Sequence, residues 1–302
     1  MPLIALVSVA AARPLDEDLA PLDAALRAAG AGVVIVDWDD PAVDWNRFDL
    51  ALLRSTWDYA ERLPEFLDWA TRVATCTQLC NPLAVLRWNT DKHYLAELER
   101  AGVAIVPSTF VEPDEDAAAA LDAFLAGTDA AEFVVKPSVG AGSRDAQRHA
   151  RANRDAAVAH VARLLDARRS VLLQPYLERV DDHGETALIH FDGAYSHAIR
   201  KGPLLRRGDG PTDALFAAED ITPRAPGEAE RALATATLAA VQHLLPGDPL
   251  LYARVDLIHD ADGSPRLLEL ELAEPSLFFA HAPGSAARFA AAVIARAGER
   301  RA

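Results

Sequence analysis

The stretch from Arg254 to Phe279 constrains the fold most, because two runs rich in Val, Leu and Ile flank a central Asp-Gly pair. Such a pair supplies the positive φ angles of a two-residue loop, so the stretch predicts an antiparallel hairpin. This loop places Asp256 opposite Glu269 and Arg254 opposite Glu271. Because side chains alternate along a strand, the three carboxylates share one face of the hairpin. The other face is expected to carry Leu268, Leu270 and Leu272.

Three carboxylates on one face call for a compensating charge, because carboxylates directly opposite each other repel. Magnesium, held by one or two carboxylates and by substrate phosphates, suits this arrangement. The hairpin therefore predicts a metal site at Asp256, Glu269 and Glu271. The alternative is a hairpin at a sheet edge whose charged face lies in water, and other segments have to decide between the two.

Length and charge limit the classes of protein that the chain can represent. Its 302 residues suffice for two or three subdomains. The 30 Lys and Arg against 45 Asp and Glu give a net charge of −15, which argues against nonspecific binding to nucleic acid or to an anionic membrane. No apolar run reaches the about 18 residues of a membrane span. Cys76 and Cys80 lack the partners of a zinc motif, so we expect a reduced, cytoplasmic protein.

Strands and helices alternate in the first quarter of the chain. Strands are expected at 3–9, 33–37 and 49–53, and helices at 16–29 and 64–74. This alternation is typical of a parallel sheet covered by helices. The apolar opening has no basic region before it, so it is interpreted as the first strand of this sheet and not as a secretory signal.

Polar and aromatic residues follow the third of these strands. In parallel sheets, ligands bind beyond the carboxyl ends of the strands. We therefore expect the following residues to form a wall for a small zwitterion: Arg54, Ser55, Thr56, Trp57, Asp58 and Tyr59. The alternative is a polar loop with a buried tryptophan.

Two lysines are candidates for binding an anion. Asn89 or Thr90 can cap a helix that ends before Gly102, which places Lys92 in the first turn. The helix dipole disfavours a cation there, so an anionic partner is indicated. An apolar strand delivers Lys136 to a loop of small residues, whose backbone N–H groups can approach phosphate oxygens. The spacing fits neither the dinucleotide fingerprint nor the P-loop, and a mobile surface loop is the alternative.

The second half of the chain contains a second hairpin signal. A Gln-Pro pair interrupts a strand expected at 171–177, and the later Asp-Gly pair at 192–193 predicts a tight turn. The segment 202–224 has no periodicity and is expected to be a long loop. The remaining elements are expected as a strand at 104–110 and helices at 114–126, 155–167, 227–244 and 284–297.

Taken together, these features resemble the ATP-grasp superfamily over residues 80–280. The segments RSTWDY, NTDK, SHAIRK and LELELAEPSLFF are similar to its glutathione-synthetase-like branch, and within it to the cyclo-ligases that close O-ureido-D-serine to D-cycloserine. The resemblance implies an α/β fold with an α+β C-terminal half. A parallel-sheet substrate domain, residues 1–85, would precede two α+β subdomains, residues 86–174 and 175–302, that clasp ATP.

The resemblance also implies a nucleotide site. Lys92 and Lys136 would hold the α- and β-phosphates, a small-residue loop would close over the triphosphate, and backbone groups after the Gln-Pro pair would bind adenine. Glu178 or Glu185 would bind the ribose, with Glu185 favoured. The full set is Lys92, Lys136, Ser138, Gly140, Gly142, Ser143, Gln174, Tyr176, Leu177, Glu178 and Glu185.

Catalytic roles follow from the same resemblance. Arg200 would neutralise the transferred phosphoryl group, with Lys201 and His197 beside it. The carboxylates of the hairpin would bind two magnesium ions, with Glu271 in place of the family's usual asparagine. Ala187 stands where related enzymes carry an arginine, whose role would fall to Arg200 and Lys201. Arg254 is expected to contact the substrate or a metal ligand.

The implied reaction is the ATP-dependent activation of a small amino acid derivative. Its carboxylate would become an acyl phosphate, and a nitrogen of the same molecule would close the ring. Two alternatives stay open at this point: a ligase of the same fold that joins two molecules, and a nucleotide-binding protein without turnover. A homo-oligomer is compatible with either.

Overall fold

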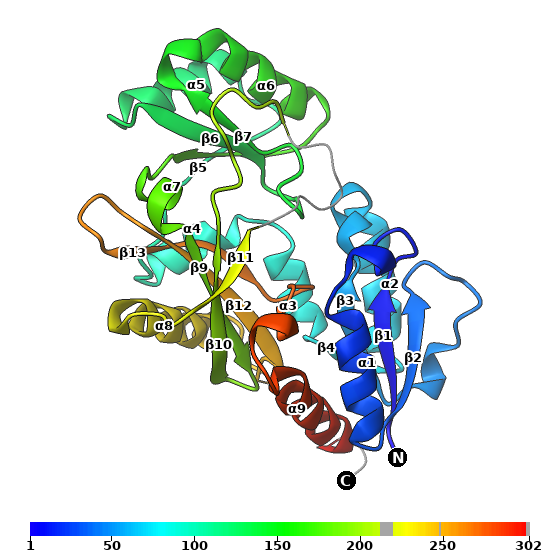
Figure 1. The fold of residues 1–302 in the computed structure, drawn as a ribbon. Coiled ribbons are helices and arrows are strands. Elements are labelled where there is room, and N and C mark those ends of the chain that lie inside the picture. Colours follow the sequence, from blue (N-terminus) through cyan, green and yellow to red (C-terminus); the bar gives the residue numbers. More distant parts are fainter. Residues whose placement is uncertain (212–219, 248, 300–302) are drawn as a thin grey trace.

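The structure is a computed structural model that describes residues 1–211, 220–247 and 249–299. The described part contains three sheets with helices packed against them (Figure 1). The first sheet is parallel and the other two are antiparallel. The predicted fold class, α/β with an α+β C-terminal half, is therefore confirmed.

The N-terminal sheet has the strand order β2-β1-β3-β4. Its strands are β1 (Leu3–Ser8), β2 (Gly32–Asp37), β3 (Leu50–Ser55) and β4 (Gln78–Cys80). Side chains of β1 and β3 alternate between two apolar cores, one against helix α1 (Leu19–Ala28) and one against α2 (Leu63–Ala74). Strands that are apolar on both faces are what a buried parallel sheet requires.

The second sheet has the order β5-β8-β6-β7 and carries two helices on one face (Figure 1). Its strands are β5 (Thr109–Val111), β6 (Glu132–Pro137), β7 (Gln147–Ala150) and β8 (Val171–Pro175). The helices are α5 (Ala117–Ala126) and α6 (Arg154–Asp166). The strand expected at 104–110 is mostly wrong, because only a single bridge at Ile105 precedes β5.

The third sheet has the order β11-β10-β9-β12-β13 and spans the middle of the molecule. Its strands are β9 (Glu185–Phe191), β10 (Ala194–Lys201), β11 (Ile221–Arg224), β12 (Tyr252–His259) and β13 (Pro265–Glu271). The short helix α7 (Arg179–His183) precedes it, and α8 (Glu228–Leu244) covers one face together with α3 (Leu83–Asn89) and α4 (Tyr94–Arg100).

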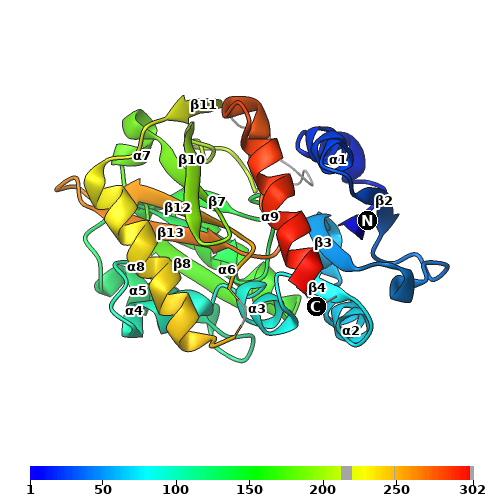
Figure 2. The same cartoon turned by 90° about the horizontal axis from the view of Figure 1, so that it is seen from below.

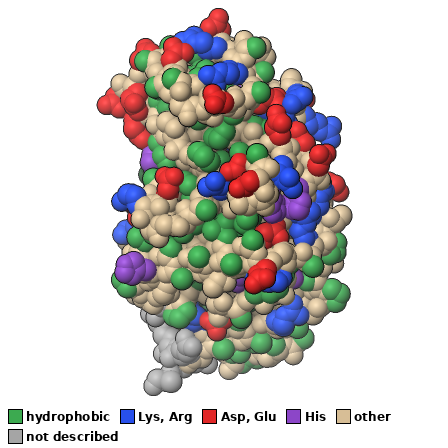
Figure 3. Space-filling view, turned by 90° about the vertical axis from the view of Figure 1, so that its left-hand side faces the viewer, with side chains coloured by type: hydrophobic (Ala, Val, Ile, Leu, Met, Phe, Trp, Pro, Cys, Tyr) green, Lys and Arg blue, Asp and Glu red, His purple; other side chains and the backbone are tan. Residues whose placement is uncertain are grey.

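The last helix, α9 (Ser285–Glu299), ties the third sheet to the first. Figure 2 shows it between α1 and β10, and its apolar side chains share a core with β1, β9 and α1. No helix in the described ranges is long and apolar enough to cross a membrane. On the face shown in Figure 3, acidic and basic side chains are interspersed.

The first hairpin keeps the predicted register at its carboxylates, although its loop is longer than predicted. Asp256 lies opposite Glu269 and Arg254 opposite Glu271, as expected. The loop, however, has three residues, 261–263, closed by a hydrogen bond from the Asp260 N–H to the Ser264 carbonyl. A bulge next to Asp256 restores the register. As a correction, Leu267 takes the core position predicted for Leu268.

Two other local predictions are wrong. Asn89 and Thr90 do not cap a helix that contains Lys92, because α3 ends at Asn89 and α4 begins at Tyr94. Lys92 therefore lies in the turn between two helices. The predicted loop 202–224 ends in strand β11, which pairs with β10, and its residues 212–219 lie outside the described residues.

Candidate active site

One cavity is lined by residues of the second and third sheets and by residues that follow strand β3 of the first sheet. The second sheet contributes Lys136, the turn after α3 contributes Lys92, and the third sheet contributes Asp256, Glu269 and Glu271. The sequence analysis placed these five side chains in one site from four separate segments. The structure brings all five to the same cavity.

Asp256 is the most enclosed of the three carboxylates, with 2% of its surface exposed. Arg254 Nε donates to both of its oxygens, at 2.9 and 3.1 Å, and Arg254 Nη2 donates to Oδ2 at 2.9 Å. Lys201 Nζ lies 2.8 Å from the same Oδ2 and 2.6 Å from Glu185 Oε1. Arg254 Nη2 also contacts Glu271. Arg254 and Lys201 are thus both paired with Asp256, and Arg254 is shared with Glu271.

Burial and neighbouring charges shift the pKa values of these carboxylates. Burial alone would raise the pKa of Asp256, but Arg254 and Lys201 hold it well below its usual range. Burial and the neighbouring carboxylates raise the pKa of Glu271 to about 7, even with Arg254 beside it. Burial opposes ionisation of Glu269, yet Lys92 and Lys136 lower its pKa. The cluster can therefore accept further positive charge near Glu271, which is what a divalent cation supplies.

The two lysines line the cavity together with the small-residue loop. Lys92 Nζ lies 3.0 Å from Glu269 Oε1 and donates to the Gly140 carbonyl at 3.0 Å. Lys136, on β6, is half-buried, and this burial together with nearby Lys92 lowers its pKa to about 8, against the attraction of Glu269. Two ammonium groups without full compensation favour an anionic ligand between them.

Most of the residues predicted to bind a nucleotide line the cavity. Gly140, Gly142 and Ser143 line it from the loop, and Gln174, Tyr176, Leu177 and Glu185 also belong to its lining. Two residues predicted for this site do not line the cavity. Ser138 does not line the cavity, because its backbone pairs with Lys92 and Ser170, and Glu178 is exposed at the start of α7. Of the two ribose candidates, only Glu185 lies at the cavity.

The predicted substrate wall is only partly present. Trp57 and Tyr59 line the cavity. Arg54 does not, because it is buried and donates to the Pro275 carbonyl at 3.1 Å. The others also bond elsewhere or are buried: Ser55 pairs with Ser8, Thr56 is fully buried, and Asp58 accepts from Trp38 and Arg62.

Two of the three predicted catalytic side chains lie outside the cavity. Arg200 points to the opposite face of β10 from Lys201 and donates to the His183 carbonyl at 3.0 Å. His197 shares the face of Lys201 but lies nearer the other end of β10, where its Nε2 is 2.8 Å from the Leu277 carbonyl. Burial lowers the pKa of His197, so the ring is neutral and acts as a structural contact. Lys201 and Arg254 occupy the cavity instead.

Among the cavity residues that sequence reasoning missed are two polar ones next to the carboxylates, Glu274 and Ser276. Both follow β13 in the segment AEPS, beyond the last carboxylate of the strand. Burial and nearby Glu271 raise the pKa of Glu274 to about 8. The one signal that could have indicated Glu274 is a further carboxylate shortly after a strand that already carries Glu269 and Glu271.

Comparisons with known proteins agree with this geometry. Residues 4–81 match the family model described as the N-terminal domain of D-cycloserine synthetase DcsG. The cycloserine biosynthesis protein DcsG of Streptomyces lavendulae is 47% identical, over 98% of this chain and 99% of its own length.

Solved structures give the same result. The crystal structure of D-cycloserine synthetase DcsG has a TM-score of 0.92 at 46% identity, covering 98% of this chain and 99% of that one. A D-alanine–D-alanine ligase from Bacillus anthracis, solved also with ATP, has a TM-score of 0.68 at 17% identity, covering 100% and 98%. The ATP-grasp ligase PsnB, solved with Mg and ADP, reaches 0.64 at 18% identity, covering 98% of each chain.

These two distant structures share the fold, and the DcsG proteins share the sequence along the whole chain. The resemblance found from four short segments is thereby confirmed. The chain belongs to the D-cycloserine synthetase family of ATP-grasp carbon–nitrogen ligases.

Proposed function

We propose that this ligase closes O-ureido-D-serine to D-cycloserine and releases ADP and phosphate. The observation that carries the proposal is one cavity in which carboxylates for magnesium, lysines for phosphates and an aromatic wall meet. The identity of 47% to the DcsG of Streptomyces lavendulae supports this choice of substrate.

In this proposal the nucleotide lies between the second and third sheets. Lys92 and Lys136 bind the phosphates, and the backbone of Gly140 to Ser143 covers them. Gly142 and Ser143 both have positive φ angles, 61° and 59°, which turn the loop backbone sharply. Gln174, Tyr176, Leu177 and Glu185 hold the base and ribose.

Asp256, Glu269 and Glu271 are the residues that would hold magnesium, in our proposal two ions. Their oxygens suit a hard cation, and burial together with the charges of Asp256 and Glu269 raises the pKa of Glu271, which a bound cation would oppose. Magnesium supplies neutralisation of phosphate charge there.

Arg254 takes the role that the sequence analysis gave to Arg200. It lies in the cavity between Asp256 and Glu271 and donates to the Ser276 carbonyl at 3.2 Å. A guanidinium at this point can neutralise the phosphoryl group as the substrate carboxylate attacks it. The acyl phosphate forms, and ADP departs.

Ring closure needs a folded substrate rather than a protein nucleophile. The nitrogen bonded to oxygen in the ureido group attacks the acyl carbon, loses its proton, and phosphate leaves. Water then cleaves the carbamoyl group from this nitrogen as carbamate, which breaks down to CO₂ and ammonia. Trp57 and Tyr59 form the apolar wall against which the substrate can fold. Glu274, beside them, is placed to bind the substrate's α-ammonium group. Holding both ends of one molecule together is a proximity effect.

Phosphate release from ATP and magnesium, measured with single compounds and with pairs of amino acids, tests the proposal. We expect turnover with O-ureido-D-serine alone, with D-cycloserine as the product. Turnover only with pairs of substrates would assign the chain to ligases that join two molecules. Absence of ADP formation with every acceptor would indicate a nucleotide-binding protein without turnover.

A further inference from the structure

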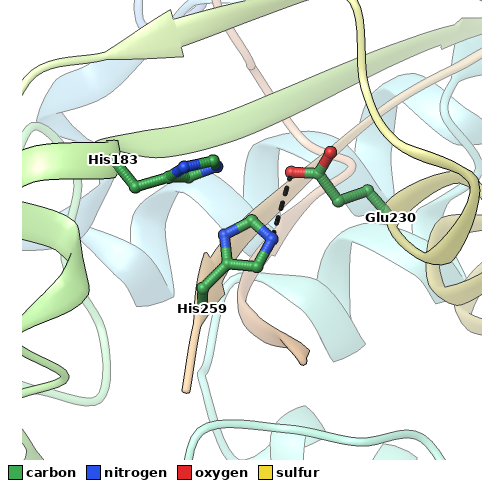
Figure 4. A group of neighbouring side chains, drawn as sticks. All are labelled: His183, Glu230 and His259. Atoms are coloured by element: carbon green, nitrogen blue, oxygen red, sulfur yellow. Dashed lines mark ion pairs between the residues drawn. The ribbon is translucent and has the colours of Figure 1, made fainter. Parts of the chain in front are cut away.

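A cluster of two histidines and a glutamate lies away from the cavity, toward helix α8. His183 ends α7, Glu230 lies in the first turn of α8, and His259 ends β12 (Figure 4). Each side chain offers one ligand atom, and the three atoms lie within 4.8 Å of one another. His259 is three residues beyond Asp256 on the same strand, so it points to the opposite face of the sheet from the active site.

The polar atoms of this cluster are not satisfied by protein groups. Among the residues that the structure describes, His183 Nε2, Glu230 Oε1 and His259 Nδ1 are buried without a hydrogen-bond partner. His259 Nε2 and Glu230 Oε1 are 3.7 Å apart, beyond hydrogen-bond distance. Buried polar groups without a partner are costly, so His183 Nε2 and Glu230 Oε1 indicate a shared ligand, and His259 turns its Nε2 toward the same glutamate oxygen.

We propose that His183, Glu230 and His259 bind a divalent transition metal, and Zn²⁺ fits best. Two imidazole nitrogens and one carboxylate oxygen are a ligand set that zinc uses. Zinc bonds of about 2.0–2.2 Å at tetrahedral angles separate neighbouring ligand atoms by about 3.4 Å. The 3.7 Å between His259 Nε2 and Glu230 Oε1 is close to that value. The fourth position would take a water molecule.

The second glutamate oxygen and the surrounding charges are compatible with this site. Glu230 Oε2 accepts from the Gly227 N–H at 2.6 Å, which caps α8 and fixes the carboxylate. Burial, together with Arg224 and Arg179, lowers the pKa of both histidines. The imidazoles are therefore neutral at neutral pH, which is the form that binds a metal. The two arginines weaken cation binding, and the charge of Glu230 opposes them.

Metal binding would link the three elements α7, β12 and α8 through one ion. Helix α7 lies between the nucleotide-lining residues Tyr176 and Leu177 and the cavity residue Glu185. A metal on His183 would fix α7 to β12 and α8. We expect a structural and positioning role, in which the metal stabilises the fold and strengthens nucleotide binding.

Zinc titration of the intact, tag-free protein tests the site directly. After EDTA treatment, the protein is titrated with ZnCl₂ by calorimetry, with millimolar Mg²⁺ present to occupy the active-site carboxylates. We expect one zinc per chain. His259→Gln and Glu230→Gln should each weaken binding more than tenfold, and the amide oxygen that the second substitution introduces still accepts the hydrogen bond that caps α8. The matched control, His243→Gln, replaces an exposed histidine of the same helix and should bind as the wild type does.

A second measurement covers variants that fold poorly. Anomalous scattering at the zinc edge, from crystals grown with zinc, should place one ion between the three side chains. His183→Gln, on the half-buried side of the cluster, provides a milder variant for the titration. Absence of zinc binding by the wild type, or equal binding by the wild type and all three variants, would overturn the proposal.

Discussion

Replacing Arg254 by methionine separates the electrostatic and the catalytic roles of the active-site arginine. Arg254 is the shared partner of Asp256 and Glu271, and these side chains are 6%, 2% and 27% exposed. Removing one partner of a buried ion pair costs about 3–5 kcal/mol. Lys201 stays 2.8 Å from Asp256, so we expect a cost of about 3 kcal/mol, or about 6 °C in melting temperature.

In our proposal magnesium binds the carboxylates that the arginine leaves, so it should recover much of this loss. A ligand at about one hundred times its Kd stabilises the native state by about 2.7 kcal/mol. Melting curves of the wild type and of Arg254→Met, with and without Mg²⁺, measure this. Turnover should stay lower by about 10²–10³, because magnesium does not replace the guanidinium at the phosphoryl group.

The control for this pair of measurements is Arg266→Met. Arg266 lies in the same hairpin, and its ion pair with Asp260 is about one-third exposed, so we expect a cost below about 1 kcal/mol. A melting temperature of Arg254→Met that does not respond to Mg²⁺ would contradict the metal assignment. Wild-type turnover by this variant would contradict the catalytic role.

Three further predictions concern single side chains. Lys136, with a pKa of about 8, loses its charge as the pH rises through that value. The value of kcat/KM for ATP should therefore fall above about pH 8, and Lys136→Arg should remove this fall. A flat wild-type profile would argue against this lysine as a phosphate ligand. Glu269→Gln should remove turnover and leave the circular dichroism spectrum unchanged; retained activity would refute its role as a metal ligand. Asn89 bonds both the Leu270 carbonyl and the Leu272 N–H, so Asn89→Ala should lower the free energy of unfolding in urea by about 2–3 kcal/mol, and an unchanged urea midpoint would show that water replaces the amide.

The carboxylates were predictable because their positions depend on register and alternation alone. The predicted two-residue loop was wrong, yet Asp256 and Glu269 still lie opposite each other, because the added loop residue is offset by a bulge. An Asp-Gly pair serves two- and three-residue loops alike, so the sequence could not distinguish them. The displaced residue, Leu268, lines the cavity instead of the core.

The catalytic cations were harder to assign, because neighbouring residues of a strand face opposite ways. Arg200 and Lys201 are adjacent, so only one of them can point into the cavity, and the sequence does not show which face of β10 that is. The resemblance favoured the arginine, whereas the structure places the lysine there. Arg254 shares the face of Asp256 by alternation, and the sequence predicted it only as a contact of the substrate or of a metal ligand.

The substrate wall and the histidine cluster show a different limit. Arg54 follows a parallel strand, as a ligand-binding residue should, but packing against the segment at Pro275 buries it. In the cluster, His183 and Glu230 are 47 positions apart and Glu230 and His259 are 29 positions apart, so no local motif indicates them. Both outcomes depend on contacts between distant segments, which residue patterns do not encode.

Transfer of oxygen from the substrate carboxylate tests the central claim most directly. O-ureido-D-serine labelled with ¹⁸O in both carboxylate oxygens is turned over with ATP and Mg²⁺, and the products are analysed by mass spectrometry. Activation as an acyl phosphate followed by ring closure predicts one labelled oxygen in the released phosphate and one in D-cycloserine. Unlabelled phosphate would contradict carboxylate activation in this cavity.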